Sequence, residues 1–184
     1  PSKVTVASSG AGSSSHLVIV DFGLKAKINL VHVPYRGAAA TVPDVISGST
    51  NSVMTEISNV LNAHLDNKLR ILAVASAARS KLVPNVPTFS EAGLAGFQAF
   101  SFCGLLVPAR TPQDVIETLR KAVVTSLSEA DTAKKFDDLA LEIPQPEDLT
   151  SKAFSDLLVR ELAVATSVAT AASIQTDSAP FGSP

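Results

Sequence analysis

Hydrophobic residues recur in short extended runs through the first half of the chain, separated by stretches with helical spacing. The pattern predicts strands at residues 3–7, 28–33, 53–54 and 69–74, the last with the strongest signal. It predicts helices over residues 14–24, 38–46 and 57–65, the second of them shortened or kinked by Pro43. Strands that alternate with helices over connections of this length indicate a parallel sheet of βαβ units.

The second half, beyond Pro108, is predicted to be almost entirely helical. Thr111 and Pro112 suit the cap and first position of a helix, and a short helix at 131–139, a strand at 141–143 and a long amphipathic helix follow. Before them, Thr88 and Glu91 have the spacing of a capping box. The helical faces either cover the first sheet or belong to a second lobe whose strands are not in this chain.

The turn between the first strand and the first helix, within SSGAGSSSHL, is the strongest candidate for a ligand site. Gly10 and Gly12 let the backbone approach a ligand, and residues 13–15 stand where a helix begins with unpaired N–H groups. Such a helix start attracts anions. The loops at 8–15, 35–37, 55–56 and 76–79 are expected to share one edge of the sheet, where open α/β sheets bind ligands.

Other motifs of small-molecule chemistry are absent from this turn. Gly12 is followed by Ser13 rather than by the lysine of a phosphate loop, and the third glycine of a dinucleotide fingerprint is missing. The nucleophile-elbow pattern is missing too. Serines with His16, Asp21 or Glu56 can still be imagined as a catalytic group, so a serine-dependent hydrolase stays an alternative. A nucleotide-binding Rossmann-like domain and a structural domain that binds nothing are further alternatives.

Composition excludes further functional classes. With 184 residues, 46% of them hydrophobic, the chain can bury a sizeable core, and a net charge of -2 gives no reason to expect nucleic acid as a partner. The three histidines are not spaced as a metal pair, so neither a metal nor a cofactor is expected. Cys103, the single cysteine, excludes an internal disulfide and is expected to be buried. No apolar stretch has the length of a membrane-spanning helix, and no signal peptide precedes Pro1.

Four segments, in order and spacing, resemble the solute-binding proteins of tripartite tricarboxylate transporters, also called the Bug family. They are SSGAGSSSHL, VHVPYRGAAATVPDVISG, KLRILAVASAARSKLVPNVPTFSEAGLAGF and GLLVPARTPQDVIETL. The similarity extends from Pro1 to about Glu161. It implies a periplasmic, non-catalytic binding protein of the type II, Venus-flytrap architecture. Such a protein closes on a small mono- or dicarboxylate and delivers it to the membrane subunits of the transporter, without itself spanning the membrane.

The resemblance also implies a division of the chain into lobes. Residues 1–97 correspond to the second, ligand-binding lobe, residues 98–109 to a hinge strand and residues 110–174 to helices of an incomplete first lobe, followed by a frayed tail at 175–184. Family members are longer, and their N-terminal segment, with the signal peptide and the strands of the first lobe, has no counterpart here. The chain alone is therefore expected to form one wall of the site and to bind weakly.

The ligand-binding residues are carried over from the same resemblance. The serine and glycine turn, which helps to hold the ligand carboxylate, comprises Ser8, Ser9, Gly10, Ala11, Gly12 and Ser13. The turn after the second strand contributes Tyr35, Arg36 and Gly37, and the end of the third strand contributes Thr55. Tyr35 either lines the cleft or packs. The sequence departs from the family pattern at Ala11, at Pro43, at Asn51 and in the absence of a tryptophan from the last helix.

Overall fold

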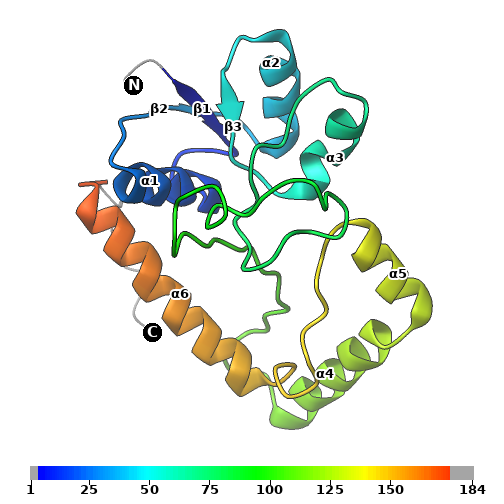
Figure 1. The fold of residues 1–184 in the computed structure, drawn as a ribbon. Coiled ribbons are helices and arrows are strands. Elements are labelled where there is room, and N and C mark those ends of the chain that lie inside the picture. Colours follow the sequence, from blue (N-terminus) through cyan, green and yellow to red (C-terminus); the bar gives the residue numbers. More distant parts are fainter. Residues whose placement is uncertain (1–3, 175–184) are drawn as a thin grey trace. The chain divides into compact units, whose positions relative to one another are not determined.

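A three-stranded parallel sheet occupies the N-terminal part of the computed structural model, which describes residues 4–174 (Figure 1). Its strand order is β2-β1-β3, with β1 (Thr5–Ser8) in the centre, β2 (Val31–Pro34) on one side and β3 (Ser52–Val53) on the other. Thr5 pairs with Val31, and Val6 pairs with both His32 and Ser52. The predicted parallel α/β sheet is thus confirmed, with three strands in place of four.

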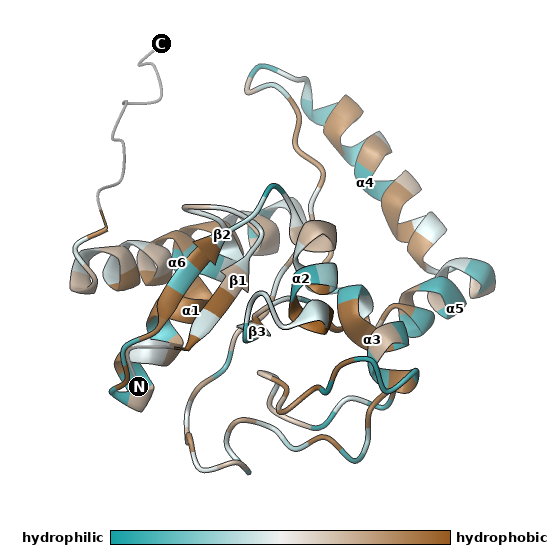
Figure 2. Cartoon of the chain, turned by 90° about the horizontal axis from the view of Figure 1, so that it is seen from above, coloured by the Kyte–Doolittle hydropathy of each residue, from teal (hydrophilic) through white to brown (hydrophobic). Residues whose placement is uncertain are grey.

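The helices between these strands follow their predicted positions. Helix α1 (Ser14–Ala26) packs against β1 and β2 and buries Ile19, while Val6 and Ala7 are the buried apolar residues of β1. It ends at Ala26, two residues beyond the predicted position, and its C-cap Lys27 has a left-handed φ of 55°. Figure 2 shows hydrophobic and hydrophilic residues alternating along β2, as expected of a strand.

Pro43 lies in the first turn of a helix and does not interrupt it. The predicted helix over 38–46 is divided into a short 3-10 turn, η1 (Ala38–Ala40), and α2 (Thr41–Ser47). Pro43 is the third residue of α2, where a backbone N–H has no partner within the helix. The helix ends at Gly48, whose φ of 81° is the conformation that glycine adopts most readily.

The strand predicted at residues 69–74 does not form. Burial alternates only from Leu69 to Ala73 and breaks at Val74, which is buried although Leu72, two residues before it, is exposed. A strand also needs a partner along its length, and among the described residues this segment has only a single bridge, from Val74 to Thr88. Val74 instead joins Val83 and Val86 in a small core cluster, against which Ile57, Leu61 and Ile71 pack.

Helix α3 (Ile57–Leu65) has its predicted bounds, and the capping box at Thr88 is confirmed. The N–H of Glu91 donates to Thr88 Oγ1 over 3.1 Å, and the N–H of Thr88 donates to Glu91 Oε2 over 2.8 Å. The segment forms one capped turn instead of a helix. Behind it, the buried ring of Phe97 meets that of Phe89 edge to face at 4.7 Å.

The C-terminal part is helical, as predicted. It consists of α4 (Gln113–Leu127), α5 (Ala130–Asp138) and α6 (Ser151–Ala171). Pro112 rather than Thr111 is the cap of α4, and no strand forms at residues 141–143 or 98–109, where the described chain offers no neighbouring strand to pair with. The apolar face of α4 stays partly exposed at Val115, Leu119 and Val123, and Cys103 is exposed rather than buried.

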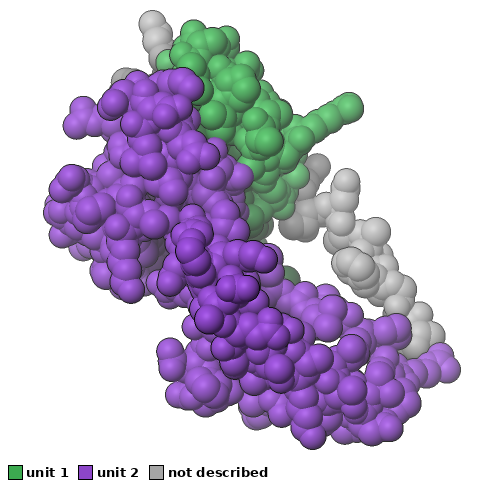
Figure 3. All heavy atoms as spheres, turned by 90° about the vertical axis from the view of Figure 1, so that its right-hand side faces the viewer, with its two compact units in different colours: residues 1–55, 161–184 green, residues 56–160 purple. Residues whose placement is uncertain are grey.

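Contacts divide the chain into two compact units, coloured separately in Figure 3. One unit combines residues 1–55 with residues 161–184, and the other comprises residues 56–160. The sheet lies in the first unit, and the core cluster around Val74 lies in the second. The lobes predicted at 1–97, 98–109 and 110–174 refer to a complete two-lobed protein and stay a prediction. The predicted frayed tail at 175–184 lies outside the described residues.

Candidate functional site

The turn between β1 and α1 is built around a capped helix start. Ser13 is the N-cap of α1, and its Oγ accepts a hydrogen bond from the N–H of His16 over 3.3 Å while donating to the carbonyl of Gly10 over 2.7 Å. Gly12 has a φ of 73° and Gly10 a φ of 152°, which both favour glycine. A Cβ on Gly10 would also lie 3.4 Å from the carbonyl oxygen of Tyr35, so the two turns approach closely there.

The structure brings this turn together with the turn after β2. The N–H of Tyr35 donates to the carbonyl of Ser8 and the N–H of Gly37 donates to the carbonyl of Ser9, each over 3.0 Å. Thr55 follows β3, whose ladder continues with the N–H of Met54 donating to Ala7 over 3.3 Å. Three of the four predicted loops therefore lie at the carboxyl edge of one sheet. The fourth, at 76–79, belongs to the other compact unit.

Most serine hydroxyls of the turn bond to one another. Ser15 Oγ accepts the N–H of Ser9 over 3.0 Å and lies within hydrogen-bond distance of the hydroxyls of Ser9, at 2.9 Å, and Ser13, at 3.1 Å. Ser8 is fully buried, and its Oγ accepts the N–H of Gly10 over 3.2 Å. Ser8 therefore stabilises the turn from beneath, whereas the half-buried hydroxyls of Ser9 and Ser13 lie nearer to solvent.

Free backbone donors lie on the exposed side of the turn. Ala11, Gly12 and Ser14 are exposed, and within residues 4–174 the N–H groups of Ala11 and Ser14 have no hydrogen-bond partner. Ser14 is the first residue of α1, so its N–H stands at the positive end of a helix of 13 residues. Two free N–H groups and this dipole form a local positive potential without any charged side chain.

Two histidines beside the turn form a contact that the sequence did not predict. The rings of His16 and His32 stack with their centroids 3.8 Å apart and their planes 11° from parallel. The N–H of Gly12 donates to His16 Nδ1 over 3.1 Å. Burial lowers the pKa of both imidazoles, and the charge of His16 lowers that of His32 further. The only signal in the sequence was the position of His16 close to the turn.

The hydroxyl of Tyr35 stabilises the turn after β2 and does not point to solvent as a free donor. Its hydroxyl donates to Asp44 Oδ2 over 2.7 Å and lies 2.8 Å from Thr50 Oγ1, which ties the turn after β2 to α2 and to the segment before β3. Asp44 and Thr50 were not among the predicted site residues. Arg36 is exposed and forms no ion pair within residues 4–174, and Gly37 caps η1 with a φ of 100°.

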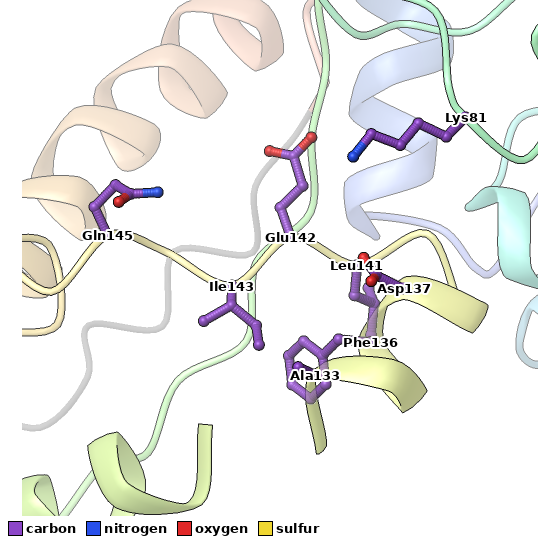
Figure 4. Close-up of a pocket in the computed structure, with 8 residues that line it drawn as sticks. All are labelled: Lys81, Ala133, Phe136, Asp137, Leu141, Glu142, Ile143 and Gln145. Carbon is purple, nitrogen blue, oxygen red and sulfur yellow. The ribbon is translucent and has the colours of Figure 1, made fainter. Parts of the chain in front are cut away.

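A separate pocket of about 340 Å³ lies in the other unit (Figure 4). It is lined by α5, the segment that follows α5 and Lys81, and it contains none of the predicted site residues. In the described part of the chain, no cluster of three or more metal-binding side chains occurs. No helix among residues 4–174 is long and apolar enough to cross a membrane.

Comparisons with known proteins agree on one family. The model of the tripartite tricarboxylate transporter family receptor matches residues 1–167. A UPF0065 protein from the tcbD-tcbE intergenic region of Pseudomonas sp. strain P51 is 32% identical over 143 residues, covering 77% of this chain and 43% of that protein. MatC from Rhodopseudomonas palustris, solved with bound malate, is 28% identical with a TM-score of 0.81, covering 90% of this chain and 56% of MatC. A solved periplasmic transporter is 30% identical with a TM-score of 0.81, covering 92% and 56%.

The chain therefore spans about half the length of each of these three proteins. The solved structures confirm the α/β fold of periplasmic binding proteins predicted from the sequence. The matched family is one of transporter receptors and not of enzymes, which counts against the hydrolase alternative. On these grounds the chain belongs to the tripartite tricarboxylate transporter receptor family.

Proposed function

We propose that this chain forms one wall of a site that captures a small mono- or dicarboxylate in the periplasm for delivery to the membrane subunits of a tripartite transporter. No catalytic step is part of this function. The observation that carries the proposal is the pair of free N–H groups of Ala11 and Ser14 at the exposed start of α1. A carboxylate has two oxygens that accept hydrogen bonds and a charge that suits a helix N-terminus.

Hydrogen bonds alone can supply the free energy to bind an anion at such a site, without a buried cation. Hydrogen bonds to a charged group contribute about 1.5 to 3 kcal/mol each, so two N–H groups and one serine hydroxyl are enough for weak, specific binding. The half-buried hydroxyls of Ser9 and Ser13 are held in place by Ser15 and need little ordering when a ligand arrives. We assign Arg36, exposed on the adjacent turn, a charge-assisted contact with the second carboxylate of a dicarboxylate.

The ten predicted site residues divide into two groups under this proposal. The first group contacts the ligand, and we place in it Ser9, Ala11, Gly12, Ser13, Arg36 and Thr55. The remaining four, Ser8, Gly10, Tyr35 and Gly37, shape the two turns through the hydrogen bonds and backbone conformations described above. The second group acts on affinity only by holding the first in position.

The comparison with MatC supports both the chemistry and the extent of the proposed site. MatC, 28% identical to this chain with a TM-score of 0.81, was solved with bound malate, a dicarboxylate. This chain covers 56% of MatC, so we propose that further ligand contacts come from a polypeptide equivalent to the remainder of that protein. Binding to this chain alone is then weak, and addition of such a lobe tightens it.

A ligand panel followed by NMR on the ¹⁵N-labelled chain tests the proposal. We expect malate, succinate and acetate to shift the backbone amides of Ala11 and Ser14, and NAD and ATP to leave them unchanged at the same concentration. The exposed Ser155 amide, in the other unit, serves as an internal control that no ligand should shift. Shifts produced by NAD or ATP but by no organic acid would favour the nucleotide-binding alternative and contradict the proposal. Turnover of an ester substrate would favour the hydrolase.

A further inference from the structure

His16 accepts a hydrogen bond from a backbone N–H of the turn. Its Nδ1 accepts the N–H of Gly12 over 3.1 Å, so this ring nitrogen carries no proton, and the amide of an exposed residue is turned toward the imidazole. We propose that His16 couples carboxylate capture to proton uptake. This inference rests on the carboxylate site proposed above. Protonation of His16 releases the Gly12 N–H and adds a positive charge beside the free N–H groups of Ala11 and Ser14.

The release follows from the chemistry of imidazole. A protonated ring carries hydrogen on both nitrogens and cannot accept a hydrogen bond, so the Gly12 N–H must find another acceptor. Gly12 is exposed and has a φ of 73°, so its backbone is solvent-accessible and meets no Cβ barrier to rotation. A carboxylate at the turn supplies the acceptor and offsets the new charge at the same time.

Few charged groups surround His16, so a bound anion would have a large effect on its pKa. The elements that pack around the pair are α1, β1 and β2, with β3 next to β1. The three strands carry no titratable side chain besides His32, and on α1 Asp21 is paired with Lys25 at 2.8 Å. Just beyond β2, Tyr35 bonds to Asp44, and Arg36 adds positive charge.

Three features of the structure disfavour a positive charge on His16. Burial lowers its pKa, and the positive end of α1 and the ring of His32, stacked with centroids 3.8 Å apart, oppose a further charge there. A bound carboxylate counters all three by its charge. Because coupling between two ligands is reciprocal, a proton that is favoured by the carboxylate must itself favour the carboxylate.

The test is the pH dependence of malate and acetate binding to the full chain, measured by NMR for wild type, His16→Gln and His64→Gln. Glutamine retains an acceptor for the Gly12 N–H but does not titrate. For wild type we expect affinity to rise about fivefold between about pH 8 and about pH 5.5, with a clearly shallower rise in His16→Gln, in which only His32 of the pair still titrates. His64 bonds to the N–H of Ile71 in the other unit, so His64→Gln should keep the wild-type slope.

A second readout needs no ligand. In the free wild-type chain, the Gly12 amide proton should shift with the same apparent pKa as the His16 ring carbons. Equal slopes in wild type and His16→Gln, affinity that falls with acid, or a Gly12 amide that ignores His16 would each overturn the coupling while leaving the carboxylate site intact. Absence of malate and acetate binding at every pH would overturn both.

Discussion

Ser8 Oγ, at the end of β1, lies 2.6 Å from Nε2 of His32 on the neighbouring strand β2. The pair has the composition of a nucleophile and its base, but Ser8 is fully buried, and its Oγ also bonds to both the N–H and the carbonyl of Gly10. No substrate can reach an oxygen in that position. The contact therefore stabilises the turn and is not a catalytic dyad.

Ser8→Ala should lower the free energy of unfolding by about 1 to 3 kcal/mol, because it leaves His32 Nε2 and the N–H of Gly10 without their partner in a buried place. Urea unfolding followed by circular dichroism measures this change. Ser155→Ala, at an exposed position on α6, is the control and should lie within about 0.5 kcal/mol of wild type. A stable Ser8→Ala protein would show that the buried contact contributes little.

Ser14→Pro isolates the contribution of one backbone donor. Ser14 is the first residue of α1, a position that proline tolerates, and Ser13 before it has φ −69° and ψ 164°, which a following proline accepts. The variant therefore retains the helix and loses only the N–H and hydroxyl of Ser14. We expect about tenfold weaker carboxylate binding, the equivalent of one charged hydrogen bond.

The matched control is Ser14→Ala, which loses the hydroxyl but retains the N–H. NMR titration with malate should give it an affinity close to that of wild type. If Ser14→Pro folds with an unchanged helix content and binds as wild type does, the amide of Ser14 is not a ligand donor. Equal losses in both variants would instead assign the contact to the hydroxyl.

The helices and the turn were predicted well because the residues that determine where they begin and end lie within a few positions of them. Ser13, Gly48 and the pair Thr88 and Glu91 act on their own segments, and all three were read from spacing alone. The strand at 69–74 failed because a strand depends on a partner far away in sequence. Burial alternates from Leu69 to Ala73, but no ladder of hydrogen bonds to another strand forms.

For the candidate site too, local features were predicted from the sequence and contacts between distant side chains were not. The glycine and serine turn was predicted from its own residues, and the meeting of the loops at one sheet edge followed from the parallel topology. The stack of His16 on His32 and the bond from Tyr35 to Asp44 depend on side chains from different elements. Nothing in the spacing of these residues indicated which would meet.

Tyr35→Phe distinguishes a support from a ligand contact. The variant loses the hydroxyl that bonds to Asp44 and Thr50 but retains the ring. We expect a lower urea midpoint of unfolding, with malate affinity within about twofold of wild type, since most single hydrogen bonds of this kind act on stability. A tenfold loss of affinity at unchanged stability would mean that the hydroxyl contacts the ligand directly.

In the unit formed by residues 56–160, a Cβ on Gly104 would overlap the ring of Phe154, so that ring would have to move. Gly104 is exposed and Phe154 only half-buried, so Gly104→Ala should destabilise the chain by no more than about 1 kcal/mol, at the low end of the cost of overpacking. The double variant Gly104→Ala with Phe154→Leu should recover part of this loss relative to Phe154→Leu alone. Additive effects of the two substitutions in urea unfolding would contradict a direct clash.

The stability of the ligand-free chain should fall with acid because of the histidine pair. The folded pKa values of His16 and His32 lie below the ordinary value of 6.5, so the unfolded chain binds more protons as the pH drops through that value. The stabilising contribution is therefore fully present above about pH 6.5 and declines from there down to the folded pKa values.

Urea unfolding at a series of pH values measures this decline. His16→Gln should have a shallower slope than wild type between about pH 7.5 and about pH 5.5, because one of the two groups no longer titrates. Saturating malate should also reduce the slope in wild type, since a bound anion offsets the imidazolium charge. If wild type and His16→Gln lose stability in parallel over this range, the acid sensitivity arises from other groups, and the neutral state of His16 does not contribute to folding.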